Sequence, residues 1–152
     1  MIYEVDTERI KSQLEYLERC LDVMFDAREA WSRDDRLACF AGARALHIGV
    51  ECVIDVGSTM IDGFIMRDPG GYLDIVDILE DENVVPSYGA VRLKELIRFR
   101  DRLVRRYHEV SEEELFRELS DTEVFHSYIT WVRDYLKQEL GSAYPGPKGE
   151  ER

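Results

Sequence analysis

The residues with the clearest chemical potential lie near position 100, where arginines gather beside a tyrosine and a histidine. Seven basic and two acidic residues fall between positions 92 and 106, which gives this window a net charge of +5. The whole chain carries −12, so the remainder carries −17. Guanidinium groups bind phosphate and carboxylate through paired hydrogen bonds. The contrast therefore predicts a local anion site on an otherwise acidic protein.

The spacing within this window brings several arginines onto one helix face. Positions 102, 105 and 106 follow position 98 by four, seven and eight residues, which is about one or two helical turns. Like charges so placed destabilise a helix mildly, and the helix C-terminus offsets this by about 0.3–1 kcal/mol per cation. We expect Arg102, Arg105 and Arg106 to bind phosphate groups. The alternative is a solvated basic face that pairs with acids of neighbouring helices.

His108 follows the arginine cluster, and histidine is the side-chain type suited to proton transfer near neutral pH. A histidine beside a phosphodiester can transfer protons as a general acid or base. We expect this role for His108. The other interpretation is a surface histidine that caps the C-terminal end of a helix.

A second set of polar residues lies between positions 47 and 62, in an otherwise apolar segment. Its five members are spaced by four, four, three and four residues on one helical stripe: His47, Glu51, Asp55, Ser58 and Asp62. Acids in a bundle can hold a divalent metal, but the Glu-x-x-His or Glu-x-x-Glu pairs from further helices are missing, so we expect no metal and no cofactor. The stripe could instead face solvent or a partner. We favour ion pairs in which Glu51 or Asp55 orients Arg100 or Arg102.

Apolar residues at helical spacing place both groups in one bundle. The expected helices cover about 7–31, 36–64, 73–82, 88–108 and 111–141, and Ser111 with Glu114 forms a capping box for the last of them. The second helix is apolar over most of its circumference, which favours a central position. We predict an all-α, up-and-down bundle of about five helices. Residues 1–141 would form a single domain and residues 142–152 a flexible tail.

The cysteines and the N-terminal sequence indicate the compartment. Cys20, Cys39 and Cys52 are odd in number, widely spaced and embedded in apolar helical patterns, which indicates buried thiols in a reducing environment. The N-terminus has neither the basic region nor the apolar core of an export signal. Acidic residues interrupt the longest apolar stretch. We therefore expect a cytoplasmic protein without a membrane segment.

Two segments together resemble the HepT-like family of the HEPN superfamily. The first extends from Ala45 through Gly57 to Asp62. The second is Arg100-Asp101-Arg102-Leu103-Val104-Arg105-Arg106-Tyr107. It is similar to the family signature of arginine, four residues, histidine, any residue and tyrosine. The similarity extends over nearly the whole chain, to about Leu140.

The resemblance implies a homodimeric helical bundle whose motif helices line a shared cleft. Proteins of this family act as metal-independent ribonuclease toxins, and a minimal nucleotidyltransferase antitoxin neutralises them by adenylylating the motif tyrosine. By position, Arg100 matches the signature arginine, Asp101 the polar residue after it and Tyr107 the modified tyrosine. The arginine cluster would then bind RNA at a local basic cleft.

The chain departs from the family pattern where the signature histidine falls on Arg105. Metal-independent cleavage of RNA needs a proton-transfer group near the 2′-hydroxyl, and a guanidinium does not release its proton at neutral pH. Arg102, five residues and then His108 satisfy a looser HEPN spacing, which predicts a shifted catalytic group at His108. The alternative is a catalytically degenerate dimer that binds a nucleotide, RNA or protein without cutting. A plainer alternative is an interaction protein whose basic helix docks an acidic partner.

Overall fold

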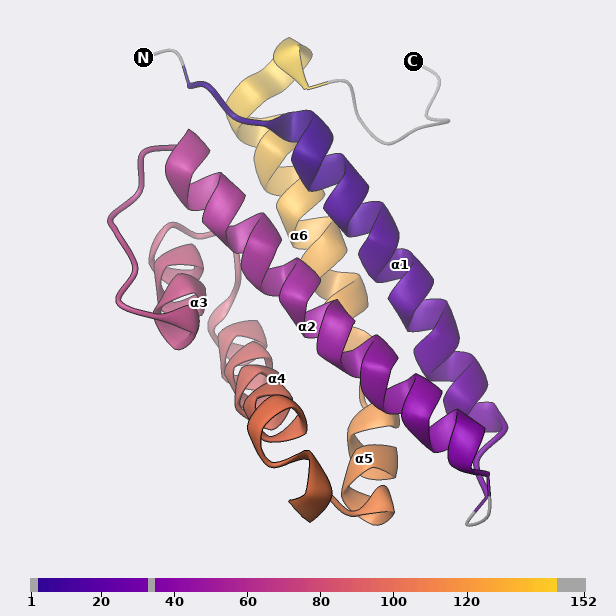
Figure 1. The fold of residues 1–152 in the computed structure, drawn as a ribbon. Helices are drawn as coiled ribbons and strands as arrows, with labels where there is room; N and C mark the ends of the chain where they lie inside the picture. Colours follow the sequence, from indigo (N-terminus) through magenta and orange to yellow (C-terminus); the bar gives the residue numbers. More distant parts are fainter. Residues whose placement is uncertain (1–2, 33–34, 145–152) are drawn as a thin grey trace.

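The computed structural model describes residues 3–32 and 35–144, and Figure 1 shows how the elements are arranged. Within these residues the chain forms six α-helices and two short 3-10 helices, and no strand. In chain order they are α1 (Thr7–Glu29), α2 (Arg36–Gly63), α3 (Tyr72–Asp81), α4 (Ser87–Arg105), η1 (Tyr107–Glu109), α5 (Glu112–Leu119), α6 (Glu123–Leu140) and η2 (Gly141–Ala143). The predicted all-α class is confirmed.

Helices α1 and α2 lie antiparallel and side by side, and they form the longest packing contact of the bundle (Figure 1). Each starts at an aspartate whose side chain accepts a hydrogen bond from the first turn. Asp6 accepts from the Arg9 backbone N–H at 3.0 Å, and Asp35 accepts from that of Ala38 at 2.9 Å. Such caps satisfy N–H groups that have no partner within the helix, so they fix where each helix begins.

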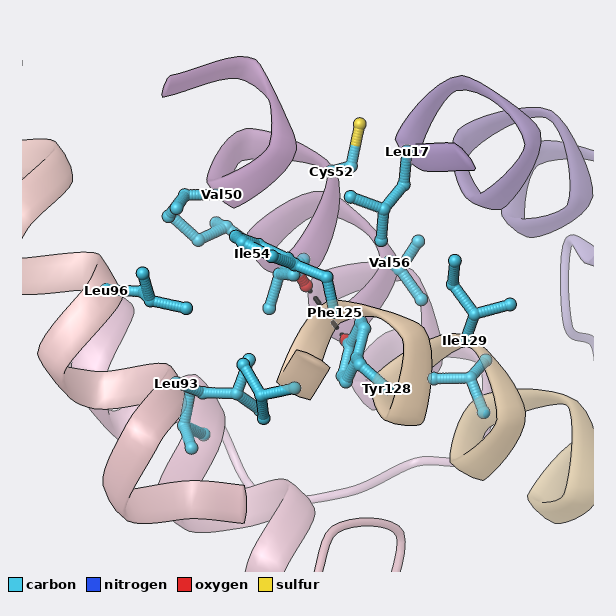
Figure 2. Close-up of a cluster of buried hydrophobic side chains, with 14 of the residues drawn as sticks. Leu17, Val50, Cys52, Ile54, Val56, Leu93, Leu96, Phe125, Tyr128 and Ile129 are labelled. Atoms are coloured by element: carbon cyan, nitrogen blue, oxygen red, sulfur yellow. Dashed lines mark hydrogen bonds between the residues drawn. The ribbon is translucent and has the colours of Figure 1, made fainter. Parts of the chain in front are cut away.

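Helix α2 is the centre of the molecule, because it packs against α1, α3, α4, α5 and α6. Figure 2 shows part of this core, where side chains of α1, α2, α4 and α6 meet. Tyr128 of α6 is fully buried, and its hydroxyl donates a hydrogen bond to the Val53 carbonyl of α2 at 2.9 Å. This bond satisfies the phenol within an otherwise apolar interior.

Glycines let neighbouring elements approach α2 closely. A Cβ at Gly57 would lie 2.6 Å from Ile75 Cγ2 of α3, and one at Gly63 would lie 2.9 Å from the Val5 backbone. Both distances are far below van der Waals contact, so these positions exclude larger side chains.

The predicted fifth helix is wrong in one respect, because it is two helices. Helix α5 ends at Leu119 and α6 begins at Glu123, so the bundle has six α-helices rather than about five. The break falls on Ser120, Asp121 and Thr122, short polar residues that compete with the helix for backbone groups. The Ser120 hydroxyl donates to the Phe116 carbonyl at 2.8 Å. The change of direction allows both α5 and α6 to bury their apolar sides.

The predicted end of the fourth helix at His108 is also wrong. Helix α4 ends at Arg105, and Arg106 has φ −130° and ψ 40°, outside the helical region. Tyr107 and His108 therefore lie in the 3-10 helix η1. The physical reason is burial: no residue between Phe99 and Leu115 is fully buried, so packing does not hold the last turns of α4 as it holds α2.

The bundle remains packed beyond the position where the sequence predicts the tail to start. Gly141 ends α6 with φ 55°, and Tyr144 is buried in the core. The remainder of the predicted tail, residues 145–152, lies outside the described residues. The three cysteines are buried free thiols.

Among the described helices, α2 alone is long and apolar enough to cross a membrane by length and composition. More than half of that apolar window, 56%, is buried inside the bundle. The hydropathy of α2 thus matches its role as the central helix of a folded domain.

Candidate functional site

Arg100 occupies the junction of three helices. Its Nε donates to Oε1 of Glu51 on α2 at 2.5 Å, and Nη1 lies 3.5 Å from Oδ1 of Asp101. Its guanidinium carbon is 5.3 Å from the centre of the Tyr72 ring at the start of α3. The side chain is only 12% exposed, so two carboxylates and an aromatic ring compensate a largely desolvated cation.

His47 extends this arrangement by one helical turn along α2. Its Nε2 lies 3.5 Å from the same Glu51 oxygen that binds Arg100, so Glu51 stands between an imidazole and a guanidinium. Burial lowers the pKa of His47 below its usual range, although Glu51 acts in the opposite direction. His47 is therefore neutral at neutral pH and keeps one nitrogen able to accept a proton.

A pocket of about 540 Å³ opens next to His47 and is called the α2–η1 pocket below. It lies between α2, the end of α4, η1 and α5, with these lining residues: Cys39, Phe40, Ala43, Arg44, His47, Leu103, Tyr107, His108, Val110, Ser111, Glu112 and Leu115. Tyr107 and His108 thus line the same pocket as His47, although some sixty residues separate them in the chain. The pocket combines an apolar lining with two imidazoles, a phenol and Arg44.

The other arginines of α4 lie around a second hollow at its C-terminal end. A pocket of about 320 Å³ is lined by Asp101, Arg102, Arg105 and Arg106. Arg105 and Arg106 are strongly exposed, with side chains 75% and 72% accessible. Their nearest acids, Asp101 at 3.4 Å and Glu109 at 4.0 Å, are weak surface partners. These two guanidinium groups are accessible to an incoming anion.

Arg102 differs from its neighbours because it is held by another helix. Its Nη1 donates to Oε2 of Glu114 on α5 at 2.5 Å. Glu114 also accepts from the backbone N–H of Ser111 and completes the predicted capping box. Together these bonds lower the pKa of Glu114 to about 2, with Arg102 as the main cause. Arg102 thereby joins the end of α4 to the start of α5.

Most of the basic residues between positions 92 and 106 form ion pairs with acids. A basic face that pairs with acids of neighbouring helices is the predicted alternative to a phosphate-binding site. Arg92 lies 2.9 Å from Glu118 and 3.3 Å from Asp121, and Lys94 lies 2.8 Å from Asp77. At the C-terminal end of α4, the exposed Arg105 and Arg106 have only weak surface partners. Arg98 is exposed and has no ion pair among the described residues, so the accessible positive charge of α4 comes from Arg98 and from Arg105 and Arg106 at its C-terminal end.

The structure pairs Arg100 with Glu51 and leaves Asp55 outside that contact. Burial, followed by the charge of Glu51, raises the pKa of Asp55. No ion pair joins Asp55 to an arginine within the described part of the chain. Across the same residues, no group of three or more histidine, cysteine, aspartate or glutamate side chains is placed to hold a metal ion.

Sequence reasoning placed His47 on the polar stripe but did not assign it to the site. The missing information was that α2 and η1 share a pocket, which depends on tertiary packing. The signal available in the sequence was the four-residue spacing from His47 to Glu51, which marks a histidine with a carboxylate partner on the same helix face.

Comparison with known proteins identifies the family. The chain matches the family model for ribonuclease HepT-like proteins over residues 13–130. It is 39% identical over 141 residues to YutE of Bacillus subtilis (strain 168), which is named as a candidate RNase, and the match covers 92% of this chain and 96% of YutE. The chain therefore belongs to the ribonuclease HepT-like family, and the resemblance predicted from its sequence is confirmed.

Solved structures share the fold. The structure of YutE, described as a cytosolic protein of unknown function, matches with a TM-score of 0.82 at 37% identity, over 92% of this chain and 96% of YutE. A Shewanella oneidensis HEPN toxin, tri-AMPylated and in complex with an MNT antitoxin, matches with a TM-score of 0.78 at 17% identity, over 86% of this chain and 99% of the toxin. At such low identity, the second match establishes the fold alone.

Proposed function

We propose that this chain is a metal-independent endoribonuclease that acts as a cytoplasmic homodimer. The observation that carries the proposal is the α2–η1 pocket, which imidazoles from α2 and η1 both line, with the exposed arginines that end α4 directly before η1 in the chain. A neutral imidazole can take the proton of a 2′-hydroxyl, and guanidinium groups neutralise the phosphate that is attacked. Membership of the ribonuclease HepT-like family supports the same chemistry.

The residues divide into three roles in this proposal. Arg105 and Arg106 meet the RNA backbone first because they are exposed, and Arg102 lines the same hollow. Arg100 binds the scissile phosphate at the junction of α2, α3 and α4. Asp101 lies beside its guanidinium group, and Glu51 is the acid that orients it. His108 transfers a proton from its place in the α2–η1 pocket. Asp55 has no such contact and is assigned no role in this mechanism.

The homodimer is supported by apolar side chains that remain exposed beside the pocket. Phe40 of α2 and Tyr107 of η1 line the pocket and are 76% and 71% exposed, and Leu37, three residues before Phe40, is 84% exposed. Exposed apolar groups gathered around one pocket mark an interaction surface. Since both motif-bearing elements contribute to this surface, a second copy would extend the pocket into a cleft between two subunits.

A minimal nucleotidyltransferase is the proposed partner. The Shewanella oneidensis HEPN toxin that shares this fold is AMPylated and bound to an MNT antitoxin. Here Tyr107 occupies the motif position, and its exposure leaves the phenol accessible to a modifying enzyme. An adenylyl group on Tyr107 would add a negative charge within the arginine cluster, and it would obstruct the pocket that the tyrosine lines.

A catalytically degenerate dimer is the second candidate, because Arg105 occupies the position of the signature histidine. Such a dimer would bind RNA or a nucleotide at the same arginines and would leave the phosphodiester intact. The two candidates share the fold, the dimer and the anion site. They differ in a single measurable property, which is cleavage.

Incubation of the purified protein with total RNA in the presence of EDTA distinguishes them. We expect the wild-type protein to cleave RNA, and Arg100→Ala and His108→Ala each to reduce the rate by at least about 100-fold, the range of a lost proton-transfer or charge-stabilising group. Arg19→Ala on α1 is the matched control and should cleave like the wild type. Cleavage that survives both site variants would indicate a contaminating nuclease or another active site. Binding of RNA without cleavage would establish the degenerate dimer.

A further inference from the structure

His47 is a partly buried polar residue that no motif assigns, and it lines the α2–η1 pocket on the side where Glu51 pairs with Arg100. It comes from α2, whereas the signature of the family lies on α4 and η1. We propose that His47 is the general base of the cleavage reaction and supplies the proton-accepting group that Arg105 cannot. This inference rests on the proposed ribonuclease function and deepens it by naming a catalytic residue.

The position of Glu51 determines which nitrogen of His47 is available. Nε2 lies 3.5 Å from Glu51 Oε1, so the neutral ring directs its N–H toward the carboxylate. Nδ1 then carries the free lone pair and becomes the proton acceptor. Glu51 itself is fixed by Arg100 at 2.5 Å, which restricts its movement and therefore the orientation of the ring. A carboxylate behind an imidazole also stabilises the imidazolium that forms during the reaction.

The charges around His47 keep it neutral at rest. Burial lowers its pKa, and Arg100 of α4 and Arg44 of α2 lower it further, while Glu51 raises it. Three further titratable groups face the same pocket from the elements packed against it: Tyr107, His108 and Glu112. His47 is suited to general-base catalysis because it is neutral at neutral pH, and because Glu51 can stabilise the imidazolium once it has accepted a proton.

His108 is less well placed to be the base. It lies in η1, after the end of α4, and its contact in the described structure is the ring of Tyr107, with centroids 5.4 Å apart. No carboxylate of a described residue lies within ion-pairing distance of His108, whereas His47 has Glu51. Since both imidazoles line one pocket, His47 as base leaves His108 free for other proton transfers there.

The step balances without an added reactant. Nδ1 of His47 takes the proton of the 2′-hydroxyl, and the 2′-oxygen attacks phosphorus and forms a new P–O bond. The P–O5′ bond breaks, and the departing 5′-oxygen takes a proton that the His108 imidazole relays from water in the open pocket. The products are a 2′,3′-cyclic phosphate and a 5′-hydroxyl. The His47 imidazolium then returns its proton to water and regenerates the neutral base.

The test compares single-turnover cleavage of a 5′-labelled RNA in EDTA by the wild-type protein and by His47→Gln, from pH 4.5 to pH 8. We expect the wild-type rate to rise with pH as His47 loses its proton and then to level off. His47→Gln should lose at least about 100-fold in rate together with that rise. Glu51→Gln should move the rise to lower pH, because removal of the carboxylate lowers the pKa of His47 further. His126→Gln, an exposed histidine on α6, is the control and should match the wild type.

The outcomes separate this inference from the proposed function. Wild-type cleavage that is lost in Arg100→Ala but retained in His47→Gln, with its pH profile intact, would overturn the role of His47 and leave the ribonuclease in place. A wild-type protein that does not cleave would overturn both. Equal thermal melting of wild type and His47→Gln would show that the variant is folded. A rate loss with an unchanged pH profile would assign His47 a structural role and contradict the proposal.

Discussion

Glu51 is the residue on which the site geometry depends. It accepts from Arg100 and faces His47, so one carboxylate compensates a guanidinium that is 12% exposed and orients an imidazole. Removing one partner of such a desolvated pair leaves the other charge without compensation, and this usually destabilises more than the pair itself stabilises. Glu51 therefore couples the stability of the α2–α4 contact to the chemistry of the pocket.

Tyr107 carries a prediction at the same scale. Co-expression with a minimal nucleotidyltransferase should attach adenylyl groups to the protein, with AMP transferred from ATP to the phenol oxygen and pyrophosphate released. Mass spectrometry of the intact protein and of its peptides should place a modification on Tyr107 and find it absent in Tyr107→Phe. RNA cleavage should fall as the modified fraction rises.

Tyr88 provides a matched control for this experiment. It is 72% exposed against 71% for Tyr107, but it lies at the start of α4, away from the arginine cluster. Modification of Tyr88 and Tyr107 to the same extent would mean that exposure alone selects the target. That result would contradict a specific role for Tyr107.

The connection from α4 to α5 decides where Tyr107 and His108 lie. Arg102 on α4 and Glu114 on α5 join the two helices across η1, and the Ser111 capping box fixes the start of α5. The three residues of η1 lie in the chain between Arg102 and Ser111, so the ion pair and the capping box restrict where η1 can lie. Since Arg102 also lines the hollow formed by Arg105 and Arg106, the same ion pair positions a part of the anion site.

This ion pair predicts a pH dependence of stability. The pKa of Glu114 is about 2 in the folded protein, below its ordinary value of 4.5, so the pair stabilises the fold fully above the unfolded value. The stabilisation should be lost as pH falls from about 5 toward 2. We expect Glu114→Gln to lower the urea midpoint at pH 7 and to differ less from the wild type at pH 3.

Glu113→Gln is the control, because Glu113 lies in the same first turn of α5 and carries the same charge. It shares the favourable interaction with the helix N-terminus but not the bond to Arg102. Equal losses at pH 7 in the two variants would show that the helix dipole, and not the ion pair, accounts for the effect.

The whole molecule is an acidic bundle with one accessible basic end and an apolar rim beside it. The −12 net charge opposes broad binding of nucleic acid, while the end of α4 provides a confined positive region. Phe40 lines the pocket at this end, and the exposed Leu37 precedes it by three residues on α2. Contact with a second subunit there would cover the apolar rim and place two basic regions near each other.

Dimerisation through this rim is testable by light scattering during size exclusion. The wild-type protein should elute with twice the 17.8 kDa chain mass. Phe40→Glu should elute as a monomer, because a carboxylate in an apolar contact is desolvated without a partner, and it should lose RNA cleavage. Phe25→Glu is the control, because Phe25 is exposed on α1 and should remain dimeric. A dimer that persists in Phe40→Glu would place the subunit contact elsewhere.

Local patterns in the sequence determined most of the helical bundle. The apolar stripes, the caps at Asp6 and Asp35 and the capping box at Ser111 act within one or two turns, so their signals are complete in the chain itself. The break at Ser120 and the end of α4 at Arg105 were missed. They depend on how much of each segment is buried, which local spacing does not contain.

The sequence by itself also determined the arginine cluster and the family, since both rest on residue types at fixed positions. Only the tertiary structure decided which acid pairs with Arg100 and that His47 shares a pocket with Tyr107. These contacts join α2 to the end of α4, about fifty residues away in the chain, and to η1, about sixty residues away. Spacing along one helix specifies which side chains share a face, whereas the packing of the whole core determines what that face meets.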